Sequence, residues 1–285
     1  MHLLIEPLQY AFMQRALIGT IAVAVLTAVV GTFVILRRLA FIGEGLAHGS
    51  LAGLAIGYLL GWNLYIAGNI YTIGLALFIG ALHEKAKVSL DTAIGILFST
   101  SMALGVALIS SLKFYSSNLT GYLFGSVLSI GSFDLMIIVG STCVILAILA
   151  VFYKEFVYYA FDPEMAEVTG LPRARLHYAM LAMIAVTVVV ASQTVGIILV
   201  TALLTIPAAS AFQWTHSLKK LVLLSVFFGL ISAILGLYLS YYLNVASGAS
   251  IALTAAVIFL LSFLCSPKRV SLGRSFGRVK TSEKG

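Results

Sequence analysis

The chain has 285 residues, of which 61% are hydrophobic and only 9% are charged. Soluble domains carry about 25% charged residues, so this composition excludes an ordinary soluble protein. The net charge of +7 does not by itself indicate nucleic-acid binding, because basic residues in a membrane protein concentrate in the cytoplasmic loops.

Segment length places the chain in the membrane. Residues 16–36 carry no charge, and at about 1.5 Å per residue they are long enough to cross the ~30 Å hydrocarbon core. Two longer apolar stretches are divided at polar or turn-like residues, one at 192–194 and the other at 244–248. The sequence therefore predicts an all-α integral membrane protein, a polytopic bundle of eight to nine transmembrane helices. In chain order, the predicted helices cover 16–36, 44–60, 64–82, 92–112, 135–153, 176–191, 195–212, 221–243 and 250–265.

Lysine and arginine predict the orientation of this bundle. With the N-terminus outside, only Arg15 and Lys113 of the 17 basic residues fall outside, and the mirror topology reverses that ratio. The C-terminus is then cytoplasmic. We expect a single transmembrane domain over residues 1–266, in the cell membrane, followed by a basic cytoplasmic tail over residues 267–285.

The second predicted helix carries a glycine at every fourth position. Gly45, Gly49, Gly53, Gly57 and Gly61 fall on one face of a helix. Without Cβ atoms on that face, a neighbouring backbone can approach closely, as in the small-xxx-small motifs of membrane helices. The spacing predicts that this helix packs tightly inside the bundle or against another subunit.

The same helix carries Glu44 and His48, and a spacing of four places both side chains on one face. If the helix starts near Arg37, His48 lies about 16 Å along it, near the middle of the membrane. Ionisable residues inside a membrane are costly and are functional by default. A carboxylate with an imidazole suits zinc, manganese or ferrous iron. The alternative is a structural pair in which the imidazole hydrogen-bonds the glutamate. Two ligands are too few for a closed metal site, which favours a transient station on a pathway.

A cytoplasmic segment, residues 161–172, reads as a short capped helix. Asp162 is the expected N-cap, Pro163 opens the first turn and Gly170 is the expected left-handed C-terminal cap. An ordinary loop helix is the alternative. His83, Glu84 and His177 lie at predicted membrane boundaries and are expected to be interfacial rather than metal ligands. The chain has no P-loop and no His-Glu-x-x-His motif, so any ATP must be bound by another chain.

Four stretches, in this order, resemble the zinc/manganese/iron permease family of ABC importers. They are residues 37–48, 122–125, 162–172 and 195–209. The resemblance implies a homodimer of permeases bound to two cytoplasmic ABC ATPase subunits and supplied by an extracytoplasmic metal-binding protein. It also implies that an acidic residue, often aspartate, and a histidine of the second helix form the metal site of the pathway; here these are Glu44 and His48. Residues 161–172 are then the coupling helix that docks in the ATPase, with Phe161, Asp162, Glu164 and Gly170 as its coupling residues.

The predicted function is therefore a transport subunit and not an enzyme, with ATP hydrolysis by the partner chain. No cofactor is expected to be bound permanently. As cargo we expect Zn²⁺ first, because the sequence Leu46-Ala47-His48 resembles zinc permeases, with Mn²⁺ next and Fe²⁺ third. The alternative function is an ion-coupled secondary transporter of a metal or cationic solute. That class uses ionisable residues along several helices and often an inverted repeat, and the sequence has neither feature. An intramembrane enzyme is disfavoured because no catalytic constellation is present.

Overall fold

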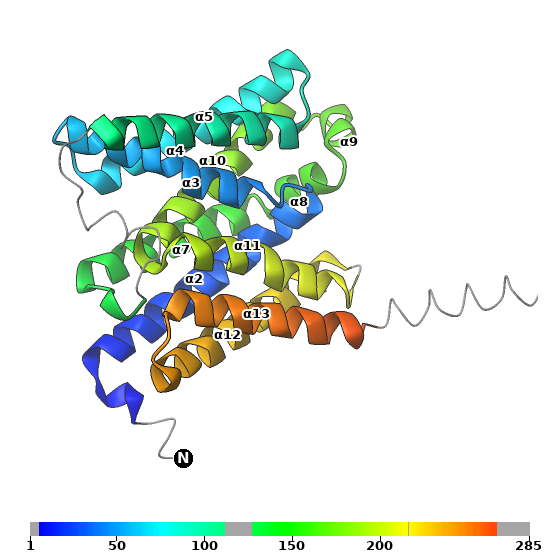
Figure 1. The fold of residues 1–285 in the computed structure, drawn as a ribbon. Coiled ribbons are helices and arrows are strands. Elements are labelled where there is room, and N and C mark those ends of the chain that lie inside the picture. The colour runs from blue at the N-terminus through cyan, green and yellow to red at the C-terminus, as the bar shows by residue number, and fades with distance from the viewer. Residues whose placement is uncertain (1–5, 112–126, 216, 267–285) are drawn as a thin grey trace, which may run out of the picture.

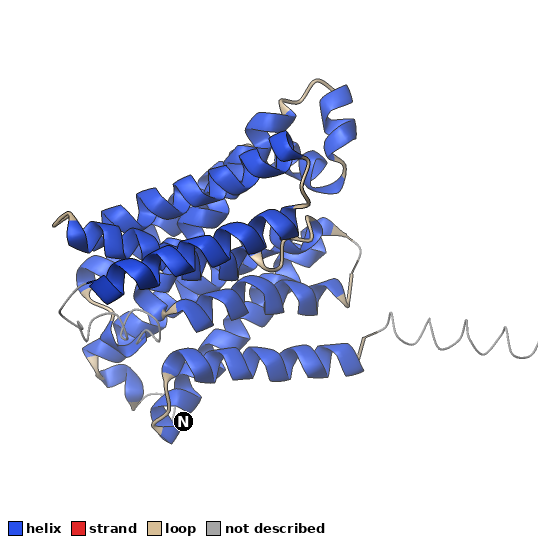
Figure 2. Ribbon diagram, turned by 45° about the horizontal axis from the view of Figure 1, so that its top comes forward, coloured by secondary structure: helices blue, strands red, loops and turns tan. Residues whose placement is uncertain are grey.

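The computed structural model describes residues 6–111, 127–215 and 217–266. All regular elements within these ranges are helices (Figures 1 and 2). The long helices are α2 (Ala11–Leu36), α3 (Ile42–Leu59), α4 (Leu64–Ala86), α5 (Leu90–Ser111), α7 (Ser132–Val151), α10 (Arg173–Val195), α11 (Ile197–Phe212), α12 (Leu218–Leu243) and α13 (Ser247–Leu264). The short ones are η1 (Pro7–Gln9), η2 (Val127–Ser129), α8 (Tyr153–Phe161) and α9 (Pro163–Val168).

Each predicted transmembrane segment overlaps one of the long helices, and the predicted all-α membrane fold is confirmed. Within the described ranges, seven helices are long and apolar enough to cross a membrane: α2, α4, α5, α7, α10, α12 and α13. Helix α11 is equally apolar but shorter. Helix α3 is not among the seven, because Glu44, His48 and its glycines lower its hydropathy. Residues 112–126, which include the motif at 122–125, and the tail 267–285 lie outside the described residues.

The division between α10 and α11 differs from the prediction. A break at the polar residues 192–194 is wrong, since α10 continues to Val195 and ends at Gly196, where φ is +91°. Ser192 is accommodated in the helix because its hydroxyl donates to the carbonyl oxygen of Val189 at 3.1 Å. Gly196 supplies the conformation that ends the helix. The predicted turn after α12 is confirmed, with Asn244 in the left-handed region.

The glycine face of α3 packs directly against α4. An ideal Cβ on Gly53 would lie 2.5 Å from Cβ of Tyr71, and one on Gly57 would lie 2.5 Å from Cβ of Ala67. Gly49 faces Leu75 of the same helix at a similar distance. At Gly53 and Gly57 the obstructing atom is fixed to the backbone of α4 and leaves no room for a side chain, so the predicted tight packing is confirmed there.

Gly61 does not belong to that face. It follows the end of α3 with φ +66°, and a Cβ there would meet nothing within 4 Å. The amide of Gly61 donates to the carbonyl of Tyr58, and the amide of Trp62 donates to the carbonyl of Gly57. These two bonds are the Schellman arrangement that closes a helix, so Gly61 caps α3 instead of packing it.

The elements that matter for function gather at one end of the bundle. Figure 1 shows α9, the junction of α2 with α3 and the C-terminal end of α13 on the right-hand side of the view. The basic residues predict that this end is cytoplasmic. The central helix α2 is largely buried, and α11 lies so close to it that a Cβ on Gly31 would clash with the carbonyl of Leu204.

Candidate metal site and coupling segment

Glu44 and His48 lie near the start of α3. Helix α2 ends before Arg37, and Arg38 turns the chain with φ +57°, so α3 begins only at Ile42. The predicted helix start near Arg37 is therefore wrong. Glu44 lies in the first turn, and His48 is about 9 Å along the helix, instead of about 16 Å. Glu44 therefore lies at the end of α3 that is predicted to be cytoplasmic, and His48 lies between that end and the middle of the helix.

The two side chains are placed differently. Glu44 is exposed, whereas His48 is half-buried and packs edge-to-face on Phe98 of α5, with 5.9 Å between ring centroids. Nδ1 of His48 is buried and has no hydrogen-bond partner among the described residues. The structural-pair alternative requires the imidazole to bond the glutamate, and the described part of the chain contains no such bond. A buried imidazole nitrogen without a partner is unusual, and the single chain leaves its hydrogen-bonding capacity unused.

The pair does not form a complete metal site by itself. Among the described residues, no group of three or more His, Cys, Asp or Glu side chains could hold a metal ion. Structural metal sites in proteins are closed by about four ligands, whereas sites that exchange their ligand keep open positions. The arrangement within one chain suits a transient ligand pair and leaves room for ligands from elsewhere.

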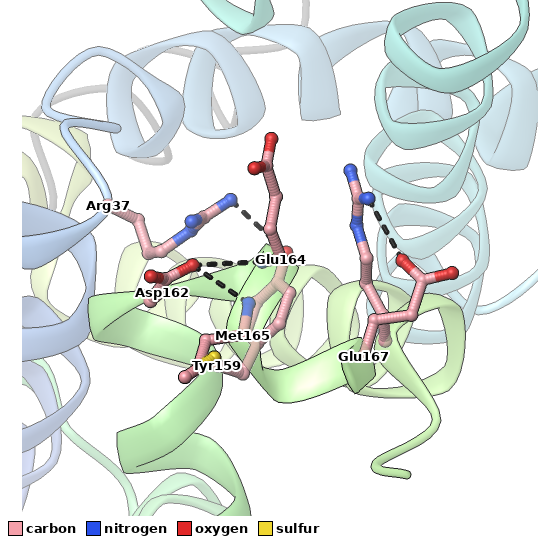
Figure 3. A network of polar contacts seen from close by, with 7 residues as sticks. Arg37, Tyr159, Asp162, Glu164, Met165 and Glu167 are labelled. Atoms are coloured by element: carbon pink, nitrogen blue, oxygen red, sulfur yellow. Dashed lines mark hydrogen bonds and ion pairs between the residues drawn. The ribbon is translucent and has the colours of Figure 1, made fainter. Parts of the chain in front are cut away.

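The predicted capped helix of the segment 161–172 is confirmed. Oδ1 of Asp162 accepts hydrogen bonds from the amides of Glu164 and Met165, at 3.1 and 2.9 Å (Figure 3). These bonds cap α9, which opens with Pro163.

At the other end of α9, Gly170 has φ +85°. Its amide donates to the carbonyl of Glu167, and the amide of Leu171 donates to the carbonyl of Ala166, both at 3.0 Å. The helix is thus closed at both ends by interactions that lie within the segment.

The end of α8 and helix α9 present apolar side chains to their surroundings. Phe161, Met165 and Val168 are each more than half exposed, Val168 at 81%. An ion pair between Arg173 and Glu167 lies beside them and is itself exposed, so it contributes little to stability. A cluster of exposed apolar side chains of this kind is suited to contact with another protein.

A buried polar network lies directly behind this segment, and the sequence did not reveal it. Nη2 of Arg37 donates to the hydroxyl of Tyr159 at 3.3 Å, and that hydroxyl lies 2.7 Å from Nδ1 of His177. Burial raises the pKa of Tyr159 above its ordinary 10.0, outweighing the nearby charge of Arg37, which acts to lower it. The hydroxyl therefore keeps its proton at neutral pH.

His177 lies near the start of α10 and is only 3% exposed, so its side chain is buried within the bundle. His83 and Glu84 remain near the surface, where His83 bonds the carbonyl of Val88 and Glu84 accepts from Tyr178. No sequence pattern links the members of the network, because Arg37, Tyr159 and His177 are far apart in the chain.

Comparisons with known proteins agree with this architecture. Residues 9–266 match the ABC 3 transport family. The manganese transport system membrane protein MntC of Listeria monocytogenes is 44% identical over 92% of this chain and 93% of its own length. A Haemophilus influenzae protein named for iron transport is 33% identical over 94% of this chain and 98% of its own. The solved structure of PsaBC from Streptococcus pneumoniae in complex with Fab is 37% identical, with a TM-score of 0.84, covering 95% of this chain and 98% of that chain.

The names of these relatives bear on the expected cargo. They mention manganese and iron, and they give no support for zinc as the first choice. The matches extend over nearly the whole length of this chain and of each matched protein. They therefore favour the ABC permease over the secondary transporter. The chain belongs to the ABC 3 transport family, and it is a multi-pass permease of a metal-importing ABC transporter in the cell membrane.

Proposed function

We propose that this permease imports manganese, and that Glu44 and His48 are the residues that bind the ion during passage. The observation that carries the proposal is the buried, unpartnered Nδ1 of His48, one helical turn from the exposed carboxylate of Glu44. Ionisable groups inside a membrane-spanning bundle are expensive unless a partner offsets their cost. A passing divalent cation is such a partner.

The ligand chemistry is compatible with manganese and with weak, reversible binding. Carboxylate and water oxygens suit Mn²⁺, and an imidazole nitrogen is acceptable to it. Mn²⁺ binds a given set of N and O ligands more weakly than Fe²⁺ or Zn²⁺, which favours release on the cytoplasmic side. Selection against zinc must then come from geometry or from the delivering protein rather than from affinity. The manganese name of the more similar of the two sequence relatives supports this choice of cargo.

A second copy of the chain would complete the site. One pair supplies two ligands, and a homodimer in which two α3 helices face the pathway supplies two carboxylates and two imidazoles. Two carboxylates also balance the charge of a divalent cation in a low-dielectric setting. The exposure of Glu44 in the single chain is consistent with a position that faces a partner or the pathway.

We propose further that residues 161–172 dock into a separate cytoplasmic ATPase. Phe161, together with Met165 and Val168, would supply the apolar contact, and Glu164 an exposed charge at its edge. Asp162 and Gly170 act by holding the shape of α9, because both are engaged in capping it. Metal would be delivered from outside by a separate binding protein.

Transport by the reconstituted complex tests this proposal. The permease is purified with its ATPase, placed in liposomes with the extracytoplasmic binding protein, and supplied with radiolabelled Mn²⁺. Uptake should require ATP, should be insensitive to ion gradients, and should persist in the presence of Zn²⁺ at equal concentration. Uptake that follows an ion gradient without ATP would favour a secondary transporter. Uptake of Zn²⁺ in preference to Mn²⁺ would refute the choice of cargo.

A further inference from the structure

The network behind α9 connects three separate parts of the chain. Tyr159 lies on α8, one turn before the N-cap of α9, and is 1% exposed. Figure 3 shows Arg37 and Tyr159 beside the capped start of α9. A tyrosine hydroxyl has one proton and two lone pairs, so it can accept from Arg37 and donate to Nδ1 of His177 at the same time. The hydroxyl is therefore the point at which the two contacts meet.

The guanidinium of Arg37 is held by two contacts with Tyr159. It lies over the tyrosine ring, with Cζ 4.7 Å from the ring centroid, and Nη2 donates to the hydroxyl. Nε of Arg37 is buried without a partner, and no carboxylate of the described residues forms an ion pair with it. A half-buried cation without a counter-charge is stabilised here by the ring and the hydroxyl of one residue. Arg37 also begins the short connection from α2 to the first turn of α3, where Glu44 lies.

His177 links the same hydroxyl to α4. Its Nε2 is buried and unpartnered, and a Cβ on Gly80 of α4 would lie 3.0 Å from that nitrogen. The same Cβ would lie 2.6 Å from Cδ1 of Leu181, so α10 and α4 are in close contact here. Helix α4 in turn packs against the glycine face of α3. Both contacts of the Tyr159 hydroxyl thus connect it to α3. The contact with Arg37 does so through the covalent connection between α2 and α3, and the contact with His177 does so through the packing of α10 on α4 and of α4 on α3.

We propose that Tyr159 is a positioning residue that transmits movement of α8 and α9 to the metal-binding end of α3. The inference rests on the proposed function, in which an ATPase moves α9. When α9 moves, the hydroxyl of Tyr159 moves Arg37 and, through it, the start of α3. The hydrogen bond to His177 anchors the same hydroxyl to α10, which packs against α4. Loss of the hydroxyl leaves α9 docked but disconnects it from the residues that bind the ion.

A purely structural role makes a different prediction. If the network only satisfies buried polar groups, its loss lowers the amount of assembled complex, and ATP hydrolysis and transport per complex stay in proportion. If Tyr159 couples the two processes, the ratio of ions imported to ATP hydrolysed falls. The ratio is therefore the measurement that separates the two roles.

The experiment compares Tyr159→Phe with Tyr158→Phe in the reconstituted complex. Both variants lose one hydroxyl and keep the ring, and Tyr158 is exposed on the neighbouring position of the same helix. We expect Tyr159→Phe to hydrolyse ATP and to import about fivefold less Mn²⁺ per ATP, the lower end of common coupling effects. Tyr158→Phe should keep the wild-type ratio. His177→Leu, which removes the same hydrogen bond from the other side, should resemble Tyr159→Phe, and the double variant should be no worse than either single one.

His177→Asn provides the rescue, because its amide can take the place of Nδ1. It should retain a ratio near that of the wild type. A ratio for Tyr159→Phe within twofold of wild type overturns the proposal. If Tyr159→Phe does not assemble, an unchanged ratio in His177→Leu overturns it instead. A wild-type complex that hydrolyses ATP but imports no Mn²⁺ would refute the proposed function, and the inference with it, whereas equal ratios in a transporting complex refute only the role of Tyr159.

Discussion

Gly53 offers the sharpest test of how α3 is held in the bundle. In Gly53→Ala the new Cβ would lie 2.5 Å from Cβ of Tyr71, 3.0 Å from its Cγ and 3.2 Å from the carbonyl oxygen of Ala67. Side-chain rotation cannot relieve these contacts, because a Cβ and a carbonyl oxygen are fixed to the backbone of α4. The two helices must therefore move apart.

The expected magnitude follows from two opposing effects. Overpacking costs typically about 1–3 kcal/mol, and alanine in place of glycine within a helix returns about 0.5–1 kcal/mol. Gly53→Ala should thus be destabilised by up to about 2.5 kcal/mol, with a central value of about 1 kcal/mol. Gly49→Ala should lose less, since its obstacle is Cδ2 of Leu75, the end of a flexible side chain. Gly74→Ala on α4 meets nothing within 4 Å and should be as stable as the wild type or slightly more stable.

Thermal unfolding of the purified proteins in one detergent measures this order. The Tm of Gly74→Ala should be the highest, that of Gly49→Ala intermediate, and that of Gly53→Ala the lowest, by a few degrees. Gly74→Ala is the matched control, because it makes the same chemical change in a helix without a close neighbour. If Gly53→Ala unfolds at the same temperature as Gly74→Ala, the close packing of α3 on α4 is refuted.

Three further predictions concern the cap of α9 and the topology. Gly170→Ala should destabilise α9 by about 1–2 kcal/mol through the positive φ alone, since a Cβ there meets no atom within 4 Å. Gly170→Asn should destabilise α9 less, and equal amide exchange of α9 in the two variants would contradict this. Asp162→Ala removes both capping bonds and should cost about 0.5–2 kcal/mol, measured as faster amide exchange in α9; unchanged exchange would show that the cap contributes nothing. In a variant without Cys143 and Cys265, Trp62→Cys should react with an impermeant thiol reagent in intact cells and Lys220→Cys should not; the reverse pattern would invert the orientation.

Much of the fold was predictable because hydrocarbon imposes long uncharged segments, and such segments are visible in one sequence. The errors arose where backbone conformation decides where a helix starts or ends. Gly61 and Gly196 both have positive φ and end helices, but their spacing and neighbours in the sequence suggested packing for the first and no role for the second. Arg38, a non-glycine residue at φ +57°, delays the start of α3, and nothing in its residue type predicts that.

The candidate site was predictable only in part. Glu44 and His48 were visible as ionisable residues four apart in an apolar helix, because their spacing is local. The partners of Arg37 were not visible, since Tyr159 and His177 approach it only after α8 and α10 have packed. Arg37 could be read from the sequence as an orientation signal, and its contact with Tyr159 adds a role that only the tertiary structure reveals.

The most direct test of the central claim is Mn²⁺ uptake by His48→Ala and Glu44→Gln, each normalised to the amount of purified assembled complex. Asp91→Asn is the control, because Asp91 is also an exposed carboxylate in the first turn of a helix. We predict that His48→Ala abolishes uptake, that Glu44→Gln lowers it at least about tenfold, equivalent to about 1.4 kcal/mol or more, and that Asp91→Asn leaves it unchanged. Assembled complexes of both site variants that import Mn²⁺ at the wild-type rate would contradict the assignment of the metal site to α3.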